Sequence, residues 1–146
     1  MAKLTFFGAT EGVTGSAYLL ETEDKTILLE CGLFQGSREE EKANDKPFPF
    51  SISTIDAVIL SHAHLDHSGR LPKLVADGYN GPVFMTYPTN DLLEILLKDA
   101  ASLQQRDAEW ENKRRRRAGK SEIEPIYTID DVEAALAMCE IGRAHV

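Results

Sequence analysis

The chain carries the stretch His62-Ala63-His64-Leu65-Asp66-His67, which places three of its four histidines and one aspartate within six positions. Imidazole nitrogens and carboxylate oxygens are the ligands that borderline cations such as zinc prefer. Surface or capping histidines that are close by chance are the alternative interpretation. Four ligand-type side chains with a bend among them favour a metal site, and suit two neighbouring cations better than one.

The flanking residues predict where this stretch lies. Residues 55–60 are apolar and β-branched with no helical period, which indicates a buried strand. Ser68-Gly69 is typical of a turn, and residues 69–77 follow a helical pattern. The stretch is therefore expected on a loop at the C-terminal end of a strand, where α/β proteins usually keep their chemistry.

Side-chain alternation gives the expected geometry of the ligands. Along an extended segment, His62, His64 and Asp66 project to one side. A turn at Asp66-His67 would then bring His67 back toward the same point.

The rest of the chain predicts an α/β fold with a mixed sheet flanked by helices. Residues 3–8, 16–22 and 25–30 are expected as short strands that pair antiparallel. A long helix is expected from Pro88 or Asp91, and a capping-box-like Thr128 begins a second one. The apolar stripe of the long helix comprises Leu92, Leu93, Leu96, Leu97, Ala100 and Leu103.

The histidine stretch resembles the His-x-His-x-Asp-His signature of the metallo-β-lactamase superfamily. Two further segments, Phe7-Gly8-Ala9-Thr10-Glu11-Gly12-Val13-Thr14-Gly15-Ser16 and Leu28-Leu29-Glu30-Cys31-Gly32-Leu33-Phe34-Gln35-Gly36, are similar to the β-CASP branch. Residues 67–72, 81–86 and 124–132 fit the same branch, so the resemblance covers Lys3 to about Glu140. It implies the N-terminal half of an αββα metallo-β-lactamase fold and a role in RNA processing.

The resemblance implies a two-zinc phosphodiesterase that cleaves RNA, with manganese as an alternative metal. His62 and His64 would hold one zinc, and Asp66 and His67 the other. Asp66 would also orient or deprotonate the attacking water. Glu30 stands where the family normally has aspartate, in the position that supports the ligands from behind; a charged residue that simply ends a strand is its alternative interpretation.

Two other functions remain open at this point. The first is a different hydrolase on the same scaffold, such as a glyoxalase-type thioesterase or lactonase, which uses the same ligands. The second is an inactive family member that serves as a scaffolding partner, although the intact histidine stretch argues against it.

The last six residues, Ile141-Gly142-Arg143-Ala144-His145-Val146, do not continue the preceding helix. A widely used sequencing adapter encodes the same hexapeptide in one frame. We therefore expect residues 1–140 to be the N-terminal part of a metallo-β-lactamase-like domain, followed by a non-native tail. The third-motif histidine, the bridging aspartate and the β-CASP domain of the family are missing, and His145 lacks the context to replace that histidine. The 146 residues alone are expected to be inactive.

Charge and composition indicate which partners and which compartment to expect. The net charge of −8 does not favour RNA, but Lys113-Arg114-Arg115-Arg116-Arg117 forms a concentrated basic run. This run is a candidate RNA contact or simply a solvated helix end. The neighbouring Trp110 is expected to be a packing residue rather than a platform on which a base stacks. The sequence shows no signal peptide and no membrane span, and its two cysteines suit reduced thiols in the cytoplasm. A homodimer of the full-length protein remains open.

Overall fold

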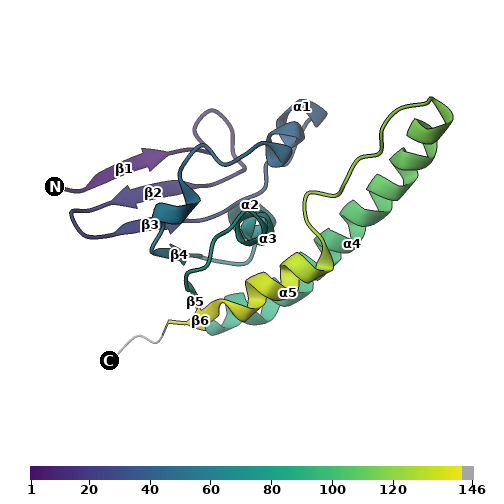
Figure 1. Cartoon of the computed structure of the whole chain (residues 1–146). Helices are drawn as coiled ribbons and strands as arrows, with labels where there is room; N and C mark the ends of the chain where they lie inside the picture. Colours follow the sequence, from purple (N-terminus) through teal and green to yellow (C-terminus); the bar gives the residue numbers. More distant parts are fainter. Residues whose placement is uncertain (143–146) are drawn as a thin grey trace.

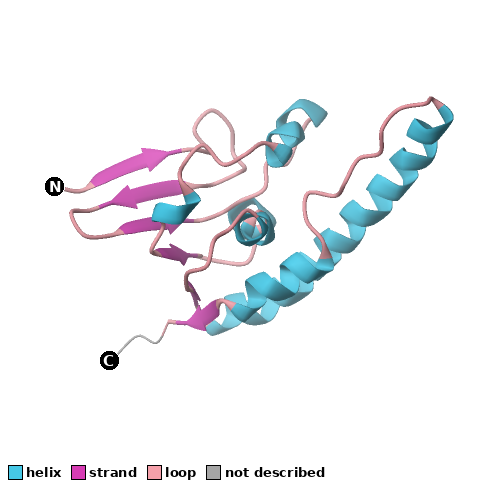
Figure 2. Ribbon diagram, in the orientation of Figure 1, coloured by secondary structure: helices cyan, strands magenta, loops and turns pink. Residues whose placement is uncertain are grey.

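The structure, a computed structural model, describes residues 1–142. Its centre is one mixed sheet in which the strands follow chain order (Figure 2). The strands are β1 (Lys3–Phe6), β2 (Tyr18–Glu21), β3 (Thr26–Leu29), β4 (Ala57–Ile59), β5 (Val83–Met85) and β6 (Cys139–Ile141). β1, β2 and β3 pair antiparallel, whereas β3 to β6 are parallel.

The helices connect the parallel strands and cover one face of the sheet (Figure 1). α5 packs against both α3 and α4, and α2 also contacts α4. The helical elements are α1 (Arg38–Glu41), η1 (Lys42–Asp45), η2 (Ile52–Thr54), α2 (Leu65–Ser68), α3 (Leu71–Ala76), α4 (Tyr87–Arg117) and α5 (Ile129–Ala137).

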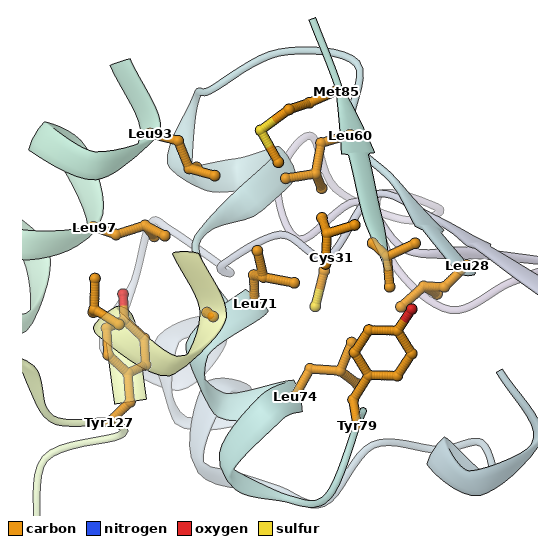
Figure 3. Packing of buried hydrophobic residues seen from close by; sticks show 14 of the residues in the cluster. Leu28, Cys31, Leu60, Leu71, Leu74, Tyr79, Met85, Leu93, Leu97 and Tyr127 are labelled. Carbon is orange, nitrogen blue, oxygen red and sulfur yellow. The ribbon is translucent and has the colours of Figure 1, made fainter. Parts of the chain in front are cut away.

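The core lies between the sheet and these helices. Leu19, Leu28, Val58 and Val83 are register partners on the four central strands, and each is at most 6% exposed. Because side chains alternate along a strand, these residues share the face that the helices cover. Figure 3 shows the helical side of this core, including Leu71, Leu74, Leu93, Leu97 and Tyr127. The opposite face of the sheet leaves Leu4, Phe6 and Ile59 exposed.

The predicted α/β class and the mixed sheet are confirmed, as are the expected strands and helices, although most are shorter than the sequence pattern suggested. The predicted stripe on α4 is partly wrong. Leu93, Leu97 and Ala100 are buried, whereas Leu92 and Leu103 are 54% and 45% exposed. A helix turns 100° per residue, so Leu92 and Leu103 point away from the buried face.

Three further expectations concern the chain as a whole. None of the helices within residues 1–142 has the length and apolarity needed to cross a bilayer. Cys31 and Cys139 are both free thiols, as expected. Ile141 of β6 pairs with Met85 of β5, and Gly142 N donates to Met85 O at 2.9 Å. Residues 143–146, including His145, lie outside the described residues, so the expected non-native tail stays a prediction.

Candidate metal centre

The histidine stretch follows β4 directly, as predicted, but its second half is helical. The amides of His67 and Ser68 donate to the carbonyl of His64 at 2.9 and 3.0 Å, and α2 begins at Leu65. The expected alternation along an extended segment therefore holds only for His62 and His64. Asp66 and His67 are presented by one helical turn, because the chain has already begun its i to i+4 hydrogen bonding there.

The two glycine-rich segments hold this turn in place through the backbone. The amides of Ser16, Cys31 and Leu33 donate to the carbonyls of Asp66, His67 and Leu65, at 3.0, 2.7 and 2.8 Å respectively. Buried backbone groups need such partners. Within this chain, the segments that resemble the β-CASP branch thus fix the position of α2.

Gly32 makes this close approach of two backbones feasible. A Cβ atom at this position would lie 1.7 Å from the carbonyl oxygen of Asp66 and 2.9 Å from the amide nitrogen of Ser16. Neither backbone atom can move aside without displacing its whole segment. Glycine is therefore required at position 32 by packing.

The ligand-type side chains gather around His67. The ring centroids of His62 and His67 are 4.1 Å apart, and those of His62 and His64 are 4.8 Å apart. The Asp66 Oδ2 and His67 Nε2 atoms are 3.5 Å apart. Two ligand atoms that share one tetrahedral cation at ~2.1 Å are separated by roughly 3.4 Å, so this pair fits a shared cation.

Glu30 lies behind these residues in a left-handed backbone conformation with a φ of 63°. Its Oε1 accepts from the amide of Ser61 at 2.9 Å, and its Oε2 lies 3.4 Å from His67 Nδ1. Glu30 Oε2 and His67 Nδ1 are both buried, and neither atom has a hydrogen-bond partner among the described residues. A carboxylate facing Nδ1 favours a ring whose Nε2 is free for a cation.

The distances between ligand atoms select a set that differs from the predicted one. Atoms of Glu30, His62 and His67 lie within 4.8 Å of one another. His64 and Asp66 fall outside that set, although both side chains border it. We interpret Glu30 as a support for His67 rather than as a ligand, because Glu30 is only 8% exposed and its Oε1 is already bonded to Ser61.

Two further side chains lie beside the centre. Ser61 was not predicted from the sequence, and Cys31 is not suited to bind the metal. Ser61 Oγ lies 2.8 Å from His62 Nδ1, which leaves the Nε2 atom of His62 free. A serine at the end of a strand carries no sequence signal that distinguishes it from an ordinary turn residue. Cys31 follows Glu30 directly, but burial raises the pKa of its thiol to about 12. At neutral pH this thiol is protonated and unsuited to bind a metal.

The basic run lies apart from this centre. Lys113 to Arg117 form the last turns of α4, and Figure 1 shows that end of the helix projecting beyond the sheet. The expectation that Trp110 is a packing residue is wrong, because its side chain is 61% exposed. Trp110 lies on the side of α4 that faces away from the buried Leu93 and Leu97.

Comparison with known proteins agrees with this geometry. The family model of the metallo-beta-lactamase superfamily matches residues 10–143, which is most of the chain. The chain belongs to this superfamily. Membership implies a divalent metal, and the group of Glu30, His62 and His67 marks a place where one could bind.

The curated relatives extend the match. A ribonuclease of Thermus thermophilus is 45% identical over 130 residues, which cover 89% of this chain and 26% of the relative. Transcription termination factor FttA of Methanocaldococcus jannaschii is 41% identical over 103 residues, covering 66% of this chain and 15% of that protein. Integrator complex subunit 11 of Danio rerio is 39% identical over 106 residues, covering 66% and 17%.

These relatives belong to the β-CASP branch, so the resemblance stated from the glycine-rich segments is confirmed. The chain spans about a quarter of the length of the Thermus thermophilus ribonuclease, and less of the other two. Among solved structures, a subclass B3 metallo-beta-lactamase of Bradyrhizobium japonicum aligns with 62% of this chain and 33% of its own. That alignment has 23% identity and a TM-score of 0.45.

Proposed function

We propose that this chain supplies the first half of the metal centre of a β-CASP-type ribonuclease, a phosphodiesterase that cleaves RNA. The observation that carries the proposal is the convergence of His62, Asp66 and His67, with Asp66 Oδ2 and His67 Nε2 separated by 3.5 Å. The similarity to a Thermus thermophilus ribonuclease supports RNA as the substrate. Residues 1–140 would then be the N-terminal part of a larger domain that completes the centre.

In this proposal His62 and His64 hold one zinc, and Asp66 and His67 hold the second, with manganese as the alternative metal. When bound, such cations would lower the pKa of a water from its ordinary value to ~7 and neutralise charge on the phosphate that is attacked. The donor set of three imidazoles and one carboxylate suits this type of cation.

The side chains of this chain perform the remaining tasks. The carboxylate of Asp66 lies next to His67 Nε2 and is placed to orient the attacking water or accept its proton. Glu30 is a positioning residue, since its Oε2 faces His67 Nδ1 and fixes the orientation of that ring. Ser61 does the same for His62 through its hydroxyl.

The first test measures metal binding by the purified 146-residue chain. Calorimetric titration with zinc should show binding at two positions, of which His62→Ala abolishes one and His67→Ala the other. Glu30→Gln should weaken binding by roughly 10–100-fold, which is the usual effect of losing an outer partner of a ligand. His145→Ala is the matched control, because it removes the fourth histidine of the chain and should leave the affinity unchanged. Equal affinity in His67→Ala would refute the site.

A second test addresses the reaction. The matched 130 residues of the Thermus thermophilus ribonuclease are replaced by those of this chain, and the chimera is assayed on single-stranded RNA and on a thioester. Metal-dependent RNA cleavage by the chimera that His64→Ala abolishes would support the proposal. Thioester hydrolysis without RNA cleavage would instead favour a glyoxalase-type hydrolase. RNA cleavage by the 146-residue chain alone would contradict the proposal that this chain supplies only half of the metal centre.

A further inference from the structure

One face of α4 carries an exposed tryptophan among cations. Arg106, Trp110, Lys113, Arg114 and Arg117 are spaced at i, i+4, i+7, i+8 and i+11, so they form one stripe along the helix. All five are exposed. This stripe, called here the Trp110 stripe, points away from the helix face that packs on the core, where Leu93 and Leu97 are fully buried.

The other two arginines of the basic run face a different direction. Arg115 Nε donates to the carbonyl of Ser121, and Arg116 Nε lies 3.2 Å from Glu122. Both side chains therefore hold the segment that returns from α4 toward α5. The contact of Arg115 is structural, since its side chain is partly buried, whereas the pair of Arg116 with Glu122 is exposed and weak. Lys113, Arg114 and Arg117, the exposed half of the run, belong to the Trp110 stripe.

The exposed half retains most of its charge. Within the described residues Arg106, Lys113 and Arg117 form no ion pair, and Arg114 has one exposed partner, Glu111, at 3.2 Å. An exposed pair of this kind contributes little and is easily exchanged for another anion. The dipole of α4 favours cations in its last turn, but Arg106 lies three turns from that end and gains nothing from it.

Trp110 lies at the centre of these cations. Its ring is 61% exposed, and the guanidinium of Arg114 lies 5.2 Å from the ring centroid. A tryptophan held flat by a neighbouring cation offers an aromatic face to a base. Its exposure has no structural role within residues 1–142.

The surroundings limit the direction that an anionic ligand can take. A groove of about 530 Å³ runs along the other side of Trp110, between α1 and the segment after α4. Five carboxylates line it against the two cations Arg38 and Lys42: Glu41, Asp45, Asp107, Glu111 and Glu124. Phosphates would be repelled from this groove and directed along the Trp110 stripe.

We propose that the Trp110 stripe is a docking surface for single-stranded RNA, separate from the metal centre. Phosphates pair with Lys113, Arg114 and Arg117, and one unpaired base stacks on Trp110. The choice of RNA as the occupant rests on the function proposed above. An acidic polypeptide could pair with the same cations, but single-stranded RNA carries an unpaired base beside every phosphate, which suits an indole with cations along both sides of it.

The test uses Trp110 itself as the probe, because it is the only tryptophan of the chain. The 146-residue chain is titrated with oligouridylate in EDTA, so that binding is measured without metal and without cleavage. Stacking should quench the indole fluorescence. The logarithm of the binding constant should fall linearly with the logarithm of the salt concentration, by about 0.7 for each phosphate contact.

Variants test whether RNA binds to the Trp110 stripe or simply to any positive charge on the protein. Lys113→Gln with Arg117→Gln removes two phosphate contacts and should reduce the slope of the salt dependence by about 1.4. The matched control, Lys3→Gln with Lys46→Gln, removes the same charge from other exposed positions and should leave the slope unchanged. By fluorescence anisotropy of labelled RNA, Trp110→Ala should bind about tenfold more weakly and Trp110→Phe nearly normally. Circular dichroism checks that each variant folds.

The results of these binding experiments can be told apart from those of the experiments that test the proposed function. No quenching by RNA, equal loss in the control, or equal quenching by polyglutamate would overturn the docking surface. RNA cleavage by the chimera described above would be unaffected by any of these results. Conversely, quenching that follows the predicted pattern would support the docking surface even if the metal centre cleaved no RNA.

Discussion

At the scale of single residues, Glu30 answers a question that the sequence raises. The family normally has aspartate here, and the extra methylene of glutamate could have moved the carboxylate out of reach. The structure places Glu30 Oε1 2.9 Å from Ser61 N and Oε2 3.4 Å from His67 Nδ1. The longer side chain therefore still reaches both neighbours, from a backbone with a φ of 63° that is uncommon for a residue with a side chain.

Gly32→Ala is predicted to be one of the most damaging small substitutions in the chain. Its methyl group would lie 1.7 Å from Asp66 O, which forces α2 away from the segment around Cys31. The free energy of unfolding, measured by urea denaturation, should fall by about 3 kcal/mol, and zinc binding should weaken with it. Gly12→Ala is the control, because no atom lies within 4 Å of its added Cβ. An unaltered Gly32→Ala protein would disprove the close approach.

At the scale of elements, α4 has two different faces. Leu93, Leu97 and Ala101 form the buried one, and the Trp110 stripe lies opposite. The helix has 31 residues and a length of roughly 46 Å, so it extends well past the sheet that its first half covers. The first half therefore packs on the core. The second half is held by the segment that follows it, through the buried Asn112, and its other side is free to carry charge.

α5 depends on its N-terminal cap. Thr128 Oγ1 accepts from the amide of Asp131, and the Asp131 carboxylate accepts from the amide of Thr128 at 2.7 Å. Thr128→Ala should lower the free energy of unfolding by about 1 kcal/mol, because the buried Val132 couples α5 to the core.

Ser37→Ala is the matched control for this prediction. Ser37 caps α1 with the same motif, but α1 buries no residue. The effect on global unfolding should therefore be smaller than that of Thr128→Ala. Equal effects would mean that α5 is not coupled to the core.

At the scale of the whole molecule, burial of weak acids makes stability depend on alkaline pH. Burial raises the pKa of Cys31 from 9.0 to about 12 and that of Tyr79 from 10.0 to about 12. The native state therefore keeps protons that the unfolded state loses, and this contribution is fully present only below pH 9. The free energy of unfolding should fall by roughly 2–4 kcal/mol as the pH rises from about 9 to about 12.

Urea denaturation at several alkaline pH values measures this decline. Burial also raises the pKa of Tyr127 and Cys139, so these groups add to the decline. Tyr79→Phe removes one of the buried weak acids, together with its hydrogen bond to Pro82 O, and should make the decline shallower. A free energy of unfolding that stays level over this range would show that these groups are hydrated in the native state.

The sequence by itself determined the strands, the helices and the stretch that carries the ligands. Alternation, helical spacing and end caps act between residues that are neighbours in the chain, so each pattern is visible locally. It did not reveal that Ser16, Cys31 and Leu33 hold α2 by its carbonyls, or that Gly32 must be glycine for that reason. It also predicted Trp110 as a packing residue.

Tertiary structure alone decided those points, because they depend on which distant segments meet. The partner of a backbone amide and the exposed side of a long helix follow from how the sheet, α2 and α4 pack together. The same holds for His67, whose Nδ1 faces a carboxylate far away in the sequence, at position 30. Local preferences fix the elements, whereas the close packing of the core fixes their relations.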